Sequence, residues 1–103
     1  MGTLSTHVLD TAAGRPGAGI AVTLSSRDGA ELGRGVTDAD GRVSSIGPDR
    51  LDAGDYVLRF DTGSYGNDFY PEVVVVFTIA DPEQHYHVPV LLSPYGFTTY
   101  RGS

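Results

Sequence analysis

Turn-forming residues interrupt this sequence at intervals of about ten residues, and that spacing limits what the chain can fold into. The interruptions are AAGRPGAG, RDGA, DADG, GPDRLDAGD, DTGSYGNDFYP, ADPEQ and SPYG. Glycine, proline and aspartate dominate them because these residues supply the backbone angles and local hydrogen bonds of tight turns. The stretches between the turns are short and rich in β-branched and aromatic residues. This arrangement predicts an all-β sandwich or barrel.

We expect eight strands, over residues 3–10, 19–27, 31–37, 42–46, 54–61, 71–79, 85–93 and 95–101. The sequence contains no helical period of useful length, no linker and no internal repeat. A length of 103 residues suits one domain, so residues 1–103 are expected to fold as a single unit. The run Val73–Phe77 is apolar on both faces, which indicates a strand at the centre of a sandwich or at a subunit interface.

Composition excludes several classes of protein. Without cysteine, the chain has no disulfide, no thiolate catalysis and no cysteine metal site. A net charge of -6 disfavours nucleic acid and anionic membranes as partners, because both select basic surfaces. No apolar run approaches the roughly 20 residues of a membrane-spanning helix. The N-terminal segment MGTLSTHVLD has neither the basic nor the apolar region of a secretory signal, so we expect a cytoplasmic protein.

Two of the three histidines are predicted to stand on outer faces of the sandwich. Side chains alternate along a strand, so the apolar residues Leu4, Val8, Tyr86, Val88, Val90 and Leu92 mark the core faces. His7 and His87 then point outward, beside the apolar residues Leu9 and Leu91. The ordinary interpretation is a pair of solvated surface histidines. Outward leucines beside them indicate instead that something covers this face.

Other polar motifs have simpler explanations when taken singly. His85 and His87 have a spacing that suits a metal, but a third ligand is missing nearby, so we expect neither a metal nor a cofactor. The segment DADG is predicted to be a turn, since the ligand ladder of a calcium loop is absent. Arg42 directly after it opens a strand, and alone would be a solvated charge. Near the C-terminus, Tyr100 and Gly102 alternate with Arg101.

The chain resembles the 5-hydroxyisourate hydrolases, the transthyretin-like enzymes of purine catabolism. The stretches that carry the resemblance are LSTHVLDTAAGRPGAGIAV, TDADGR and HYHVPVLLSPYGFTTYRGS. The resemblance implies a transthyretin-like β-sandwich of eight strands, with at most one short helical turn in the shortened loop near 62–70. It places the active site on His7, Arg42 and His87, and on the tetrapeptide Tyr100, Arg101, Gly102 and Ser103.

The resemblance also implies partners and a reaction. It implies a homotetramer, a dimer of dimers, whose active sites lie in a channel where the outer faces meet. The substrate is 5-hydroxyisourate, and attack of water on a cyclic acyl carbon gives 2-oxo-4-hydroxy-4-carboxy-5-ureidoimidazoline. Transthyretin, a thyroid-hormone carrier, shares the fold but lacks these histidines, the arginine and the tetrapeptide, so the enzyme is favoured over a non-catalytic small-ligand carrier. A monomeric interaction domain is a further alternative.

In this hypothesis His7 and His87 activate water and transfer protons, because the pKa of imidazole lies near working pH. Arg42 binds the anionic, carbonyl-rich substrate and stabilises negative charge in the transition state. Ser103 positions substrate or water through its hydroxyl or the terminal carboxylate, and Tyr100, Arg101 and Gly102 shape the pocket. The chain is accordingly expected to end inside its active site.

Overall fold

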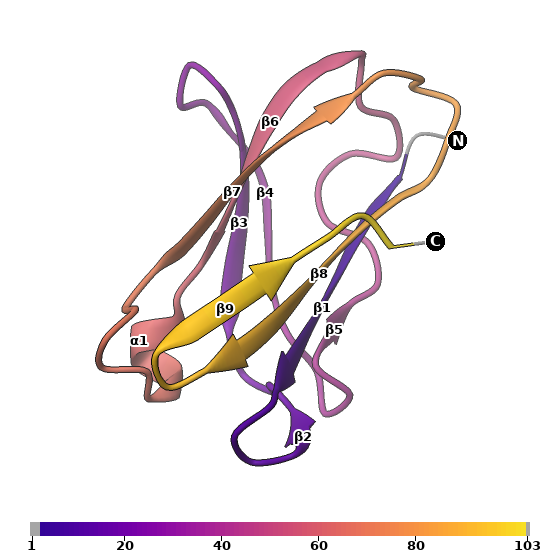
Figure 1. Cartoon of the computed structure of the whole chain (residues 1–103). Helices are drawn as coiled ribbons and strands as arrows, with labels where there is room; N and C mark the ends of the chain where they lie inside the picture. Colours follow the sequence, from indigo (N-terminus) through magenta and orange to yellow (C-terminus); the bar gives the residue numbers. More distant parts are fainter. Residues whose placement is uncertain (1–2, 103) are drawn as a thin grey trace.

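Two β-sheets pack face to face in the computed structural model, which describes residues 3–102 (Figure 1). The first sheet contains β1 (Leu4–Asp10), β2 (Arg15–Pro16), β5 (Arg42–Val43), β8 (Tyr86–Ser93) and β9 (Gly96–Thr99). The second contains β3 (Ala21–Ser26), β4 (Glu31–Val36), β6 (Gly54–Phe60) and β7 (Val73–Ile79). The predicted all-β sandwich is confirmed.

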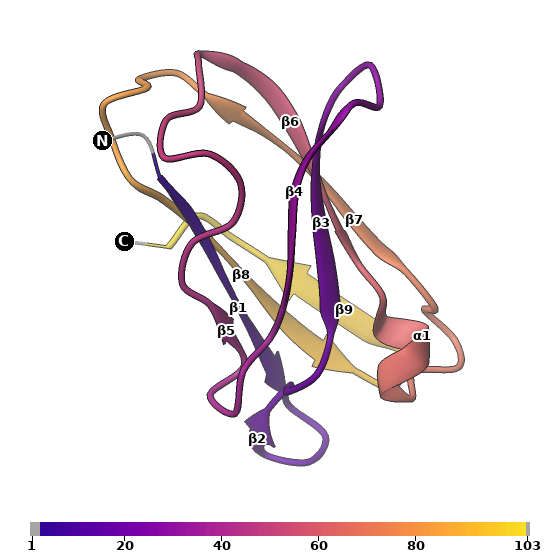
Figure 2. The ribbon, with the colours of Figure 1, turned by 180° about the vertical axis from the view of Figure 1, so that it is seen from behind.

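Strand β1 lies in the middle of the first sheet, whose order is β2–β1–β8–β9, with β5 also paired to β1. Its pairing with β8 is parallel, whereas the other strand pairs are antiparallel. The second sheet has the order β4–β3–β6–β7. A β1–β8 pair brings the first and the penultimate strands side by side, as both views of the ribbon show (Figures 1 and 2).

Most strands begin or end within two residues of the predicted boundaries, and two differences are larger. The turn segment AAGRPGAG contains an additional two-residue strand, because Gly14 has a positive φ of 68° and returns the chain along β1, where Pro16 pairs with Leu9. The predicted strand 42–46 keeps only Arg42–Val43, both paired with β1. The described residues therefore form nine strands, two of them only two residues long.

Alternating side chains of the two sheets build the core, as the sequence pattern predicts. Leu4 and Val8 of β1 are fully buried, and so are Leu24 of β3 and Phe60 of β6. Strand β7 follows the same period, with Val73 and Val75 buried, so its other valines face outward. Both β7 and β9 end their sheets, and each leaves one strand edge unpaired within the described chain.

The loop after β6 keeps one turn of helix, α1 (Thr62–Tyr65). Asp61 caps its N-terminus by accepting a hydrogen bond from the Ser64 backbone N–H, and Gly66 ends it with a φ of 124°. Figure 2 shows α1 at the end of the sandwich away from the described C-terminal residues. The described part of the chain contains no other helix, and α1 is far too short to cross a membrane.

Candidate active site

The outer face of the first sheet gathers the predicted polar residues through strand register. In the β1–β5 pair His7 lies directly opposite Arg42, and in the β1–β8 pair Ser5 lies opposite His87. Residues paired in this way share a face of the sheet. The rings of His7 and His87 have centroids 6.5 Å apart, tilted by 34°. Three separate strands therefore bring two imidazoles and a guanidinium to one place.

A hollow of about 470 Å³ opens over these side chains, within the roughly 300–1,000 Å³ common for small-molecule sites. Its lining consists of Ser5, His7, Arg42, His85, His87, Tyr100 and Gly102. Five of the residues singled out in the sequence therefore meet here. Half of the Tyr100 side chain is exposed at the site, which leaves the hollow open to the outside of the single chain.

The remaining two predicted residues are not brought into this hollow. The guanidinium of Arg101 lies over the ring of Tyr86, 4.8 Å from its centroid, and donates a hydrogen bond to Gln84 at 3.1 Å. Arg101 therefore lies beside the buried ring of Tyr86 and does not line this hollow. Ser103 lies outside the described residues. The roles of both stay predictions.

His7 and Arg42 are fixed by the turn DADG. The Nε2–H of His7 donates to the Asp40 carbonyl at 2.9 Å, because a carbonyl oxygen only accepts, and this assigns the lone pair of neutral His7 to Nδ1. One carboxylate oxygen of Asp38 accepts the backbone N–H groups of Asp40 and Arg42, at 2.9 and 3.0 Å. The bond from the Arg42 N–H is the main cause that lowers the pKa of Asp38. The predicted turn thus carries two site residues.

His87 is held mostly neutral by its surroundings. Partial burial lowers its pKa most, because burial penalises the charged imidazolium, and the positive charge of Arg42 acts in the same direction. His7 and His85 lower the pKa of His87 further. An imidazole with a pKa below its ordinary 6.5 carries a free lone pair at neutral pH, which is the state that a general base needs.

Ser5 and His85 belong to the site although the sequence analysis gave neither a catalytic role. The Ser5 hydroxyl lies 2.8 Å from Nδ1 of His87 and 2.9 Å from Nε2 of His85. The same alternation that places His7 outward also places Ser5 outward, so its position on this face was available from the pattern. Its contact with His87 depends on the parallel register of β1 and β8, which the pattern does not contain.

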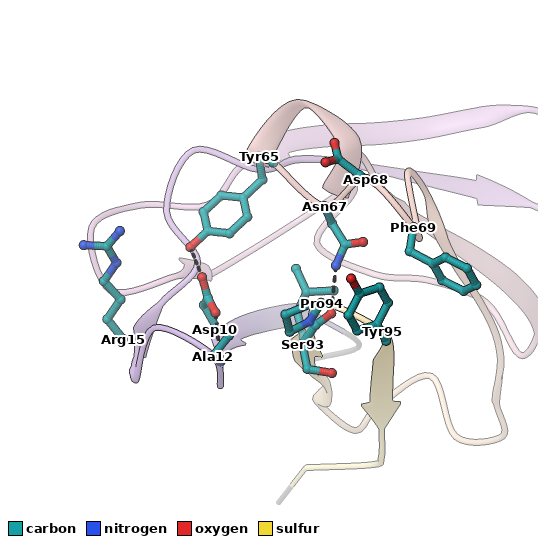
Figure 3. Close-up of a pocket in the computed structure, with 12 residues that line it drawn as sticks. Asp10, Ala12, Arg15, Tyr65, Asn67, Asp68, Phe69, Ser93, Pro94 and Tyr95 are labelled. Carbon is teal, nitrogen blue, oxygen red and sulfur yellow. Dashed lines mark hydrogen bonds between the residues drawn. The ribbon is translucent and has the colours of Figure 1, made fainter.

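A second hollow lies at the other end of the sandwich, between α1 and the loops after β1 and β8 (Figure 3). Two pairs of its polar groups are hydrogen-bonded to each other. The Tyr65 hydroxyl donates to the Asp10 carboxylate at 2.7 Å, and the Asn67 amide donates to the Ser93 carbonyl at 2.8 Å. The bond from Tyr65 is the main cause that lowers the pKa of Asp10. These contacts attach the α1 loop to the first sheet, away from the histidines.

Comparison with known proteins agrees with the geometry. The model of the HIUase/Transthyretin family matches residues 4–102. The 5-hydroxyisourate hydrolase of Mus musculus is 45% identical over 97% of this chain and 94% of its own length. The structure of Klebsiella pneumoniae 5-hydroxyisourate hydrolase is similar with a TM-score of 0.91 at 38% identity, over 100% of both chains. Sea bream transthyretin in complex with thyroxine has a TM-score of 0.84 at 34% identity, over 96% of this chain and 93% of its own. The chain therefore belongs to the HIUase/transthyretin family.

Proposed function

We propose that this protein is a 5-hydroxyisourate hydrolase, which opens the ring of its substrate to give 2-oxo-4-hydroxy-4-carboxy-5-ureidoimidazoline. The observation that carries the proposal is the meeting of His7, His87 and Arg42 in one hollow. The full-length similarity to hydrolases of this name supports it. In the reaction the water oxygen adds to a cyclic acyl carbon, the ring C–N bond breaks, and the leaving nitrogen takes up a proton.

His87 is the proposed general base, because its lowered pKa leaves the imidazole neutral. The 6.5 Å between the two ring centroids leaves space for one water that donates hydrogen bonds to both rings. His7 offers Nδ1 to that water, since its Nε2–H is used by Asp40. His87 takes the proton of the attacking water, and the same proton is then available for the leaving nitrogen.

Arg42 supplies positive charge at the place where the reaction creates negative charge. Its guanidinium is a cation whose planar fork matches paired oxygens of an anionic, carbonyl-rich ring. As water adds to the acyl carbon, negative charge develops on the carbonyl oxygen, and a fixed cation nearby stabilises that transition state. Tyr100 and Gly102 border the hollow. They are proposed to bind substrate together with Arg101 and Ser103.

We further propose that residues 1–103 act as one domain in a cytoplasmic homotetramer, a dimer of dimers with its active sites at the interface between the dimers. The open hollow and the exposed side chains of Tyr100, Val74 and Val76 support association with further copies. Native mass spectrometry tests the tetramer, and a monomer would contradict it. Cell fractionation with the native chain tests the location.

The catalytic proposal is tested by following the ultraviolet decay of 5-hydroxyisourate, generated in place from urate by a urate oxidase. We expect faster decay with the wild type than without protein, and no acceleration with His87→Ala. Circular dichroism of the variant controls for folding. Equal decay in all samples would overturn the hydrolase and leave a carrier of the transthyretin fold, for which titration with the same purine would detect binding without turnover.

A further inference from the structure

A single buried hydroxyl connects the two histidines of the segment HYH. Ser5 is only 9% exposed, and its oxygen lies within hydrogen-bond distance of one nitrogen from each ring, Nδ1 of His87 and Nε2 of His85. His87 is half-buried at the hollow, while His85 is exposed, and its other nitrogen, Nδ1, is hydrogen-bonded to the hydroxyl of Thr3. The three side chains form an unbroken line of hydrogen bonds from His87 to the exposed His85, which also lines the hollow.

The two imidazole rings are coupled because Ser5 has a single hydroxyl proton, which it can donate to only one of them. A serine hydroxyl has one proton to donate and lone pairs to accept with. When Ser5 donates to His85, the Nδ1–H of His87 donates to Ser5, and the Nε2 of His87 keeps its lone pair. When Ser5 donates to His87, the Nε2–H of His85 donates to Ser5, and the Nε2 of His87 carries the proton. The tautomer of one neutral ring therefore fixes the tautomer of the other.

We propose that His87, Ser5 and His85 form a proton relay that connects the hydrolytic site to solvent, with Ser5 and His85 as positioning residues that act through His87. This inference rests on the proposed function for its catalytic consequence. The relay keeps Nε2 of His87 unprotonated before water attacks. When His87 takes the proton of the attacking water, the relay passes another proton on through Ser5 to His85 and solvent, and it returns one when the leaving nitrogen is protonated.

Each step of the relay conserves protons and charge. His87 accepts the water proton at Nε2, and its Nδ1–H bond breaks as that proton moves to the Ser5 oxygen. The Ser5 O–H proton moves to Nε2 of His85, which becomes the cation, and the Nδ1 proton of His85 leaves to solvent. The line ends in its second tautomeric state, and a proton that enters in the reverse direction restores the first.

The charged and titratable groups that face His87 are His7 and Arg42 from β1 and β5, His85 before β8, and Tyr100 after β9. Arg42, His7 and His85 each lower the pKa of His87 by charge. Ser5 differs because it is hydrogen-bonded to the ring. A variant that removes only the Ser5 hydroxyl therefore tests the relay while the charges that act on His87 stay in place.

Ser5→Ala is the primary variant, with Ser5→Thr as the form that keeps the hydroxyl. Ser25→Ala is the matched control, since Ser25 is 8% exposed and lies in the other sheet. We expect Ser5→Ala to lower kcat by about tenfold or more, with little change in KM. Loss of a complete acid–base group typically costs about 10²–10⁴-fold, and Ser5 acts only through His87. In mixtures of H₂O and D₂O the rate of the wild type should curve with deuterium fraction, as several protons move together. Ser5→Ala should give a straight line, and Ser5→Thr should regain rate and curvature.

His85→Gln tests the relay without touching the core, because His85 is exposed. It should reproduce the loss of kcat and of curvature. Unchanged kcat in both Ser5→Ala and His85→Gln, beside an active wild type, would overturn the relay and leave the hydrolase standing.

A measurement without substrate tests the relay even if the wild type fails to hydrolyse 5-hydroxyisourate. Nitrogen-15 NMR of the imidazoles reports which ring nitrogen carries the proton. We expect Ser5→Ala to shift the ring-nitrogen signals of both His85 and His87, and Ser25→Ala to shift neither. Unmoved signals in folded Ser5→Ala would show that the hydroxyl does not couple the two rings, and would contradict the inference directly.

Discussion

Gly102 lies directly against the imidazole of His87. Its backbone N–H donates to the His87 carbonyl at 2.8 Å, and a Cβ built on Gly102 would come within 2.4 Å of Cδ2 of that ring. Real Cβ atoms do not approach so closely, so any side chain at this position must displace either the ring or the backbone. A glycine therefore allows the segment after β9 to form one wall of the hollow.

Gly102→Ala is expected to lower kcat/KM by about tenfold or more, because a small displacement of a catalytic group is costly to the rate. The stability of the fold should change little, since the core lies on the other face of the sheet. Steady-state kinetics with the ultraviolet assay, beside thermal unfolding, measures both. Gly96→Ala is the control, because an added Cβ there would have ordinary contact with Ser93 at 3.4 Å. Equal activity of the two variants would contradict the contact.

The pKa of His87 should rise in Arg42→Gln, because that change removes one of the positive charges that lower it. Burial is the larger cause and persists in the variant, so the pKa should stay below its ordinary 6.5. The acid limb of the rate profile, where His87 gains a proton, should move to higher pH with it. NMR titration of the His87 ring protons measures the pKa without substrate. A downward movement would show that Arg42 does not act on His87 by charge.

Asp38→Ala should reduce kcat/KM by about tenfold through loss of positioning. The Asp38 carboxylate holds the turn that carries the Asp40 carbonyl and Arg42, and therefore orients His7 as well. The matched control is Asp28→Ala, because Asp28 accepts similar bonds from Ser26 and Ala30 in a turn of the other sheet. Steady-state kinetics should show the loss of kcat/KM in Asp38→Ala and not in Asp28→Ala. Equal losses would point to a general effect of turn aspartates on the fold.

Tyr65→Phe should destabilise the protein by about 1 kcal/mol, because it removes one hydrogen bond to the Asp10 carboxylate. The effect on kcat should be small, since the second hollow (Figure 3) shares no lining residue with the hollow that contains the histidines. Urea unfolding at neutral pH measures the loss, with Tyr95→Phe as the control at a largely exposed tyrosine in the same hollow. A fall in kcat larger than the fall in stability would link this end of the sandwich to catalysis.

Much of the site was predictable because strand alternation is a strong local signal. The period of two placed His7 and His87 on the outer face, and it separated Arg101 from Tyr100 and Gly102, as the structure has them. The resemblance grouped Arg101 with its neighbours in the pocket. Its guanidinium lies over the ring of Tyr86, and its role in the site stays a prediction.

The relations between strands were not predictable in the same way. Nothing in the local pattern of β1 and β8 indicates that they pair in parallel, or that Ser5 falls opposite His87. Such register depends on contacts between residues far apart in the sequence. The sequence analysis therefore found the residues on the correct face but missed the hydroxyl that joins two of them.

The parallel pairing of β1 with β8 has a consequence for how the protein folds during its synthesis. Ser5 and His87 are 82 residues apart, yet they touch across that pair. A nascent chain emerging from the ribosome holds β1 without β8 until β8 itself has been synthesised, and long-range pairing of this kind forms slowly. The catalytic site should therefore form late in synthesis, because a chain interrupted before β8 would contain His7 and Arg42 but lack His87.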